Sequence, residues 1–218
     1  MFPLLATGLA AAALHLAALA GLLPPLAASL TKPLPVVCLA LAVISREGSP
    51  YARRLTLGLA LSALGDVVID VPVLFLAGLG LFLLAHLATA WALLSEAKQA
   101  AWPRALPAAA LAAGALALLA PRLGWMALPV TLYALALGAA LWRALAAVGV
   151  PGRAALARWL AVAGLLLFAG SDLALGMDRF LARPVAGGAM LVMVLYWAGQ
   201  AGIAASVLAA GRRETAAA

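Results

Sequence analysis

PVLFLAGLGLFLLAHLATAWALL, residues 72–94, is an apolar run whose only ionisable side chain is His86. An α-helix rises about 1.5 Å per residue, so a run of this length crosses the roughly 30 Å hydrocarbon core of a bilayer. Pro72 opens the run two residues after Asp70, and a charged stretch that includes Glu96 and Lys98 follows it. The run therefore predicts a membrane-spanning helix.

The same pattern recurs along the whole chain. Of 218 residues, 67% are hydrophobic, 7 are acidic and 14 are Lys or Arg, and the mean hydropathy is +1.15. Proline, glycine and charge clusters divide the chain into apolar segments. The segments are 3–23, 33–45, 53–70, 72–94, 104–120, 124–143, 156–177 and 184–210. The sequence thus predicts an all-α polytopic membrane protein with eight transmembrane helices.

We expect one domain over residues 1–210, followed by a solvated tail at 211–218. The first apolar segment has no basic residues before it, which indicates a membrane helix rather than a cleaved signal peptide. The formal net charge of +7 lies in short loops between apolar runs, the pattern of membrane topology and not of nucleic-acid binding. The expected surroundings are a lipid bilayer, and the oligomeric state stays open.

The loop charges predict an orientation. With eight spans, the side that holds both termini carries ten basic residues and the other side carries four. The ten are Arg46, Arg53, Arg54, Lys98, Arg104, Arg143, Arg153, Arg158, Arg212 and Arg213, and the four are Lys32, Arg122, Arg179 and Arg183. This asymmetry places both termini in the cytoplasm of a protein integral to the cell (inner) membrane.

An internal repeat connects the two halves of the chain. GLALSALGD at 58–66 matches GLLLFAGSD at 164–172, and PLPVVCLAL at 33–41 matches ALPVTLYAL at 127–135. Half-repeats of about 1–98 and 99–210 with four helices each would be parallel, because an even number of spans returns the chain to its starting side. Asp66 and Asp172 then occupy equivalent positions and face each other across the repeat axis.

Carboxylates inside apolar segments need an explanation, because a charge near the bilayer centre costs about 3 kcal/mol on insertion scales. Asp66 and Asp70 are four residues apart and share one helix face. Asp70 also has a structural interpretation as a helix-end residue, and a surface ion pair with Arg179 is the structural interpretation of Asp178. Asp66 and Asp172 are the candidate catalytic residues.

Other polar residues form a supporting set. His86, Tyr196 and Gln200 lie at similar depth, and they can either serve the site or hydrogen-bond between helices. Lys32 can meet a phosphate or extend to the membrane surface as an ordinary interfacial lysine.

No metal site is expected, because two His and one Cys on different helices are a poor zinc ligand set. Two carboxylates in an apolar cavity favour a shared proton instead, with one group as acid and the other as base. No cofactor is implied, and the assignment of acid and base to Asp66 and Asp172 stays open.

These motifs resemble a known family. GLALSALGDVVI, FLAGLGLFLLAHLATA, LLFAGSDLALGMDRF and YWAGQ, with TKPLP before them, resemble the YhhN family of eight-helix membrane proteins, the lysoplasmalogenases. The resemblance covers residues 32 to about 203. One departure is that His86 leads into Leu-Ala-Thr-Ala, where the family pattern often has an aromatic residue.

The resemblance implies hydrolysis of the vinyl ether bond of a lysophospholipid, the lysoplasmalogen, to a fatty aldehyde and a glycerophospho head group. It also implies that Asp66 and Asp172 are essential. Protonation of the alkene carbon gives a cation that water attacks, so an Asp pair can supply both the acid and a stabilising negative charge. Two rivals remain: a proton-coupled transporter of a small molecule or lipid that uses the same Asp pair, and a non-catalytic lipid-binding protein.

Overall fold

The computed structural model describes residues 1–46, 48–150, 154–181 and 187–211, and every regular element within them is helical. Nine α-helices are present in these residues, with short 3-10 turns at Pro72–Leu74 (η1), Trp102–Arg104 (η2) and Gly124–Met126 (η3). The α-helices are α1 (Phe2–Leu19), α2 (Pro25–Thr31), α3 (Leu34–Arg46), α4 (Pro50–Val68), α5 (Phe75–Leu94), α6 (Ala105–Leu123), α7 (Ala127–Val148), α8 (Ala155–Leu181) and α9 (Gly188–Gly211).

Local sequence explains where several helices begin and end. α4 starts at Pro50 after Ser49, whose hydroxyl accepts a hydrogen bond from the Ala52 N–H, and proline tolerates the first helical turn. α1 ends at Leu19, shortly before Gly21, which adopts a positive φ of 77°. Such a φ favours glycine and interrupts the helix. The first helix therefore ends before residue 23, where the apolar segment was expected to end.

A short helix that was not expected lies between the first apolar segment (3–23) and the second (33–45). A short α2 precedes α3, and Lys32 closes α2 just before Pro33. Apolar residues nevertheless continue from Pro25 to Ser45, long enough to cross a membrane as one stretch. This break explains why the segment at 33–45 is short for a complete span.

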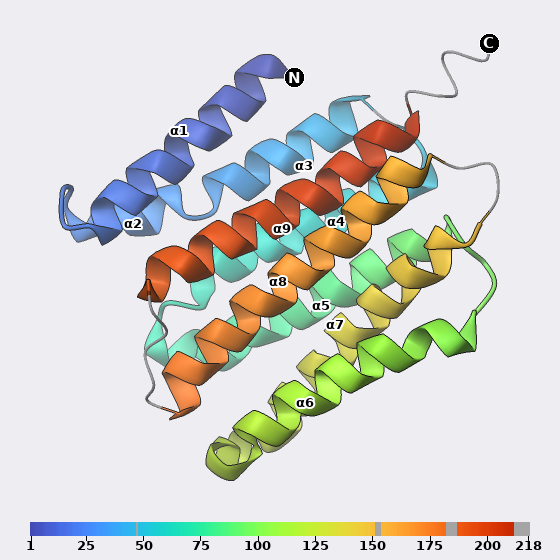
Figure 1. Cartoon of the computed structure of the whole chain (residues 1–218). Helices are drawn as coiled ribbons and strands as arrows, with labels where there is room; N and C mark the ends of the chain where they lie inside the picture. Colours follow the sequence, from blue (N-terminus) through green and yellow to red (C-terminus); the bar gives the residue numbers. More distant parts are fainter. Residues whose placement is uncertain (47, 151–153, 182–186, 212–218) are drawn as a thin grey trace.

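The long helices form one bundle in which neighbours in sequence pack side by side (Figure 1). α8 packs along α9 and α4 packs along α5, while α5–α7 and α3–α9 join the two halves of the chain. Glycines permit the closest crossings. A Cβ on Gly58 would lie 2.9 Å from Thr89 Oγ1 of α5, and one on Gly164 would lie 2.6 Å from the Gly199 oxygen of α9.

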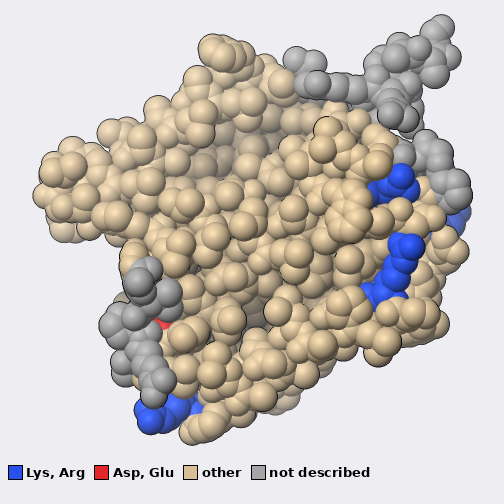
Figure 2. Space-filling model, viewed as in Figure 1, with Lys and Arg blue, Asp and Glu red and all other residues tan. Residues whose placement is uncertain are grey.

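The outer surface is strongly apolar. Large hydrophobic side chains remain exposed along many helices, for example Leu9 at 73%, Leu57 at 47% and Leu128 at 68%. Figure 2 shows one face, on which a broad band without charged side chains separates basic patches near the two ends of the helices. Such a surface would be unstable in water, so these helices belong in a bilayer, as expected for an integral membrane protein.

Length and apolarity identify six candidate membrane spans within the described residues. One of them, Trp102–Val148, contains both α6 and α7, and α4, which carries Arg53, Arg54 and Asp66, is not among the six. The all-helical class is confirmed. Eight spans and a duplicated architecture remain proposals, as does the single domain. The tail at 212–218, with Arg212 and Arg213, lies outside the described residues, as do Arg153 and Arg183.

Candidate active site

Asp66 lies near the end of α4 and is only 3% exposed. The Tyr196 hydroxyl of α9 donates a hydrogen bond of 2.8 Å to its Oδ2 atom. Gly65 lets α4 approach this point closely, because a Cβ there would lie 2.8 Å from the Phe82 ring of α5. α4, α5 and α9 together therefore hold the first carboxylate.

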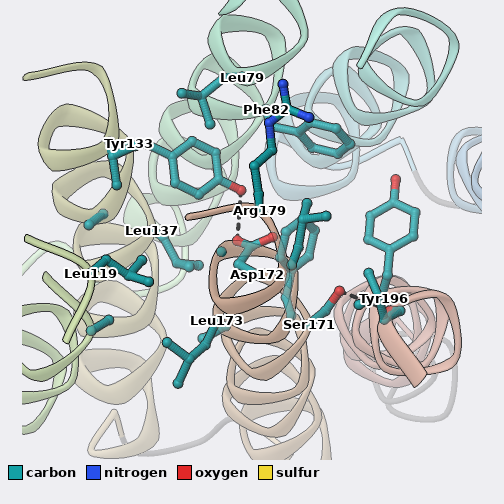
Figure 3. A pocket seen from close by; sticks show the side chains of 18 of the residues that line it. Leu79, Phe82, Leu119, Tyr133, Leu137, Ser171, Asp172, Leu173, Arg179 and Tyr196 are labelled. Atoms are coloured by element: carbon teal, nitrogen blue, oxygen red, sulfur yellow. Dashed lines mark hydrogen bonds between the residues drawn. The ribbon is translucent and has the colours of Figure 1, made fainter. Parts of the chain in front are cut away.

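Asp172 lies on α8, and its side chain is 22% exposed. The Tyr133 hydroxyl of α7 donates a hydrogen bond of 2.7 Å to Asp172 Oδ2 (Figure 3). His86 Nε2 of α5 lies 3.0 Å from that hydroxyl and 3.9 Å from Asp172 Oδ2. Because the Tyr133 hydrogen is directed at Asp172, the neutral His86 ring donates from Nε2 to the Tyr133 oxygen.

An aromatic cluster connects the two carboxylate sites. The Phe168 ring makes edge contacts with His86, with centroids 4.7 Å apart, and with Tyr196, with centroids 5.3 Å apart. Phe82 makes further edge contacts with Phe168 and Tyr196. These rings surround the hydrogen-bonded groups with apolar surface, which strengthens electrostatic interactions inside the site.

Both carboxylates line a single cavity of about 350 Å³. Asp66, Asp172, Tyr133 and Tyr196 supply its polar groups near the aromatic cluster. A long apolar extension runs between α6, α7 and α8. Its residues include Ala108, Leu111, Ala115, Leu116, Leu119, Val130, Leu137, Leu141 and Leu173. The expectation that Asp66 and Asp172 belong to one site agrees with this shared lining.

Three further charged residues of the cavity, Lys32, Asp70 and Arg179, lie at one end of the bundle. With Phe75 they define what we call the mouth. The Lys32 ammonium donates to both Asp70 oxygens, at 2.6 and 2.7 Å. Arg179 places its guanidinium 3.9 Å from the centre of the Phe75 ring. Lys32 thus meets a carboxylate of the protein itself.

Three supporting residues lie outside the cavity lining. His86 is 2% exposed and acts only through Tyr133, whereas Gln200 is 3% exposed and its Nε2 has no hydrogen-bond partner within the described residues. Asp178 is exposed near the end of α8. In the described part of the chain, no ion pair joins Asp178 to Arg179.

Tyr133 and Arg179 are the site residues that sequence reasoning did not select. Tyr133 lies in ALPVTLYAL, the repeat segment that precedes the second Asp motif, where Thr131 and Tyr133 are the residues with hydrogen-bonding side chains. A search for hydrogen-bonding groups in that segment would have found it. Arg179 gave no such signal, because its contact with Phe75 depends on helices distant in sequence.

The described residues contain no group of three or more His, Cys, Asp or Glu side chains able to hold a metal ion. Two carboxylates that line one largely apolar cavity can exchange protons with a substrate bound there.

Comparisons with known proteins place this site in context. The sequence matches the YhhN family over residues 27–207. It is 39% identical over 185 residues to the lysoplasmalogenase TMEM86B of Homo sapiens, covering 83% of this chain and 75% of the relative. No solved structure matches this one.

Relatives from two further organisms are also named lysoplasmalogenase. A lysoplasmalogenase of Mycobacterium bovis is 38% identical over 175 residues, covering 74% of this chain. The match spans 61% of that relative's length. The lysoplasmalogenase TMEM86B of Sus scrofa is 35% identical over 187 residues, covering 84% of this chain and 76% of the relative. The family match covers most of the sequence and includes both carboxylates, so this chain belongs to the YhhN family.

Proposed function

We propose that this protein is an intramembrane hydrolase that cleaves the vinyl ether bond of lysoplasmalogens. One observation carries the proposal: two carboxylates from different halves of the chain, Asp66 and Asp172, line one largely apolar cavity. Its relatives named lysoplasmalogenases supply the substrate class. No cofactor is needed, because the reaction consumes only water.

Asp66 is the general acid in this proposal. Its Oδ2 accepts the hydrogen bond from Tyr196, so the transferable proton resides on Oδ1. Asp66 transfers this proton to the vinyl ether carbon that does not bear oxygen, which leaves an oxocarbenium ion. Enclosure of Asp66 supports the assignment, because a deeply buried carboxyl group is most easily accommodated in its neutral form.

Asp172 is the carboxylate that stabilises the cation and then acts as base. It is more exposed than Asp66, and the chain of hydrogen bonds from His86 through Tyr133 ends at its Oδ2. The hydrogen bond from Tyr133 and the lower burial of Asp172 relative to Asp66 both favour an ionised carboxylate. His86 and Tyr133 are positioning residues in this scheme, since His86 does not line the cavity.

The proton balance closes over two steps. Water attacks the cationic carbon and gives a proton to Asp172. The substrate becomes a hemiacetal. The hemiacetal hydroxyl then returns a proton to Asp66 while Asp172 protonates the glycerol oxygen. The carbon–oxygen bond breaks, and the products are a fatty aldehyde and a glycerophospho alcohol, with both Asp residues in their starting states.

The apolar extension between α6, α7 and α8 accommodates the hydrocarbon chain of the substrate. A lysophospholipid reaches such a site through the bilayer, which explains why the carboxylates lie among membrane helices. The head group then occupies the mouth, where the charged residues of the cavity lie.

The membrane topology is part of the same proposal. The protein crosses the inner membrane eight times, with both termini on the cytoplasmic side. This topology places the mouth on the non-cytoplasmic side. Two parallel repeats are supported by Gly58 and Gly164, which lie eight residues before Asp66 and Asp172. Each glycine allows its helix to cross the next one closely, α4 on α5 and α8 on α9.

The test is aldehyde release by the purified protein in lipid nanodiscs. We expect aldehyde from a lysoplasmalogen and none from the saturated alkyl ether of the same length, which has no alkene to protonate. Absence of aldehyde from protein with a cooperative thermal transition would overturn the proposed function. Proton-coupled transport would then be the alternative to measure, by substrate uptake into proteoliposomes.

A further inference from the structure

The mouth of the cavity carries Asp70 just beyond the end of α4 and Arg179 on α8, and these two helices hold the proposed catalytic carboxylates. Asp70 follows Asp66 by four residues on the same chain segment, and Arg179 follows Asp172 by seven on α8. At about 1.5 Å per residue, these spacings are roughly 6 and 10 Å along the helix axis. A glycerol and phosphoester bridge is of this length, so a head group bound at the mouth leaves the ether bond at the carboxylates.

Arg179 is available to an anionic ligand. Its guanidinium is held over the Phe75 ring at 3.9 Å, and within the described residues no carboxylate pairs with it. In Figure 3 its side chain extends from the same helix as Asp172 and lies over the cavity. Guanidinium groups bind phosphate through two parallel hydrogen bonds, and stacking on a ring leaves the edge of the group free to make them.

Lys32 is different, because Asp70 neutralises it. The buried Lys32 ammonium contacts both Asp70 oxygens, yet the Asp70 side chain is 59% exposed. A carboxylate has about four acceptor positions, so Asp70 retains capacity on its exposed side. Arg179 is the cation of the mouth whose charge no carboxylate within the described residues offsets, so the phosphate is expected there and the exposed side of Asp70 remains for a cation.

We propose that the mouth binds a zwitterionic phosphodiester head group, with Arg179 on the phosphate and Asp70 on the ammonium of ethanolamine or choline. Lys32 is a positioning residue that fixes Asp70 in this arrangement. This inference rests on the proposed function, since it concerns the same cavity, and it assigns head-group recognition to Arg179 instead of Lys32.

Three substrates with one alkenyl chain test the proposal: alkenyl glycerophosphoethanolamine, alkenyl glycerophosphate and alkenylglycerol. We expect Arg179→Gln to raise KM for both phosphate-containing substrates about tenfold to a hundredfold, with kcat unchanged, and to leave alkenylglycerol hydrolysis unaltered. Asp70→Asn is expected to abolish the preference for the ethanolamine substrate over the phosphate substrate. A merely structural role would affect all three substrates alike.

Arg122→Gln is the matched control, because Arg122 is an exposed arginine at the same end of the bundle and is not among the lining residues. Equal KM changes for alkenylglycerol, or no change with any substrate, would overturn the head-group proposal.

Failure of the proposed function is distinguishable from failure of the head-group site. If the wild type releases no aldehyde, binding of a saturated alkyl ether lysophosphoethanolamine is measured by calorimetry in detergent. Arg179→Gln is expected to weaken that binding while Arg122→Gln is not. Equal binding by both variants would overturn the head-group site independently of any hydrolysis.

Discussion

The carboxylates of the two halves lie in similar sequence motifs. They differ in the side chains that contact the tyrosine donating to each of them. Asp66 and Asp172 each follow a small residue, lie eight positions after a glycine and accept a hydrogen bond from a tyrosine on another helix. Behind Tyr133 stands His86, which extends the hydrogen bonds away from the cavity. Next to Tyr196 the rings of Phe82 and Phe168 pack, and Gln200 of the same helix is its polar neighbour. Similar motifs thus occupy unequal surroundings, which is what an acid and a base in one site require.

The largest effect is expected from the carboxylates themselves. Asp66→Asn and Asp172→Asn each retain the shape of the side chain and remove its ability to exchange a proton. We expect each to lower kcat for aldehyde release about a thousandfold, within the range for general acid–base catalysis.

Thermal unfolding in detergent is the control for these two variants, because an isosteric amide preserves the packing of α4 and α8. A fully active Asp172→Asn protein would contradict the paired mechanism. Loss in the Asp66 variant alone would assign the whole reaction to one carboxylate.

The next largest effect on kcat is expected from the polar side chains next to the two tyrosines, His86 and Gln200. His86→Phe removes the donor to Tyr133 and keeps an aromatic ring against Phe168. We expect kcat to fall about tenfold with KM unchanged, since loss of one hydrogen bond in a buried network costs roughly 1 to 2 kcal/mol.

Gln200→Leu is the matched change in the other half, because Gln200 follows Tyr196 by one helical turn and its Nε2 has no partner within the described residues. We expect kcat within about twofold of the wild type for this variant. Equal losses in the two variants would show that the two carboxylates are supported alike.

A smaller difference between the two halves is expected in the stability effect of replacing the glycine at each helix crossing. Gly164→Ala would bring a Cβ to 2.6 Å from the backbone oxygen of Gly199. In Gly58→Ala the nearest backbone oxygen, that of Ala85, would be 3.1 Å away, and the Thr89 hydroxyl 2.9 Å away. Overpacking against backbone costs about 1 to 3 kcal/mol, so we expect Gly164→Ala to lower Tm more than Gly58→Ala.

Gly138→Ala is the control for helix propensity, because its Cβ would meet Ala112 at an ordinary 3.7 Å. We expect a Tm equal to or above the wild-type value, since alanine favours a helix over glycine. A Gly164 variant as stable as this control would contradict the close crossing of α8 and α9.

The smallest effect is expected at the mouth. Lys32→Gln removes an ion pair whose Asp70 partner is largely exposed, and exposed pairs contribute about 1 kcal/mol or less. Thermal unfolding should shift by only a few degrees. A large loss of stability would show that Lys32 holds α2 and α4 together rather than only orienting Asp70.

Local sequence predicted the apolar helices well, because membrane insertion depends on composition over a window of about 20 residues. Each apolar segment contains one long helix, although boundaries moved where Pro33 and Gly21 interrupt the backbone. The short helix α2, which precedes the expected segment 33–45, was not predicted. Hydropathy averages over such breaks and does not register them.

The candidate site was predicted in part. Ionisable groups in apolar segments identified Asp66, Asp172 and Tyr196, since such groups are costly in lipid and need a partner. His86 was found for the same reason, although its partner was not. Tyr133 and the contact of Arg179 with Phe75 were missed, because a tyrosine or an interfacial arginine is common in membrane helices and carries no signal alone.

The sequence by itself determined that this chain is helical, apolar on its surface and marked by two carboxylates in matching motifs, because these properties follow from composition and local spacing. Only the tertiary structure decided that both carboxylates line one cavity, that His86 reaches Asp172 through Tyr133, and that Asp70 neutralises Lys32 while Arg179 stays unpaired among the described residues. The physical reason is that hydrogen bonds and ion pairs act over a few ångströms. Which groups come that close is set by the packing of helices that lie far apart in the chain.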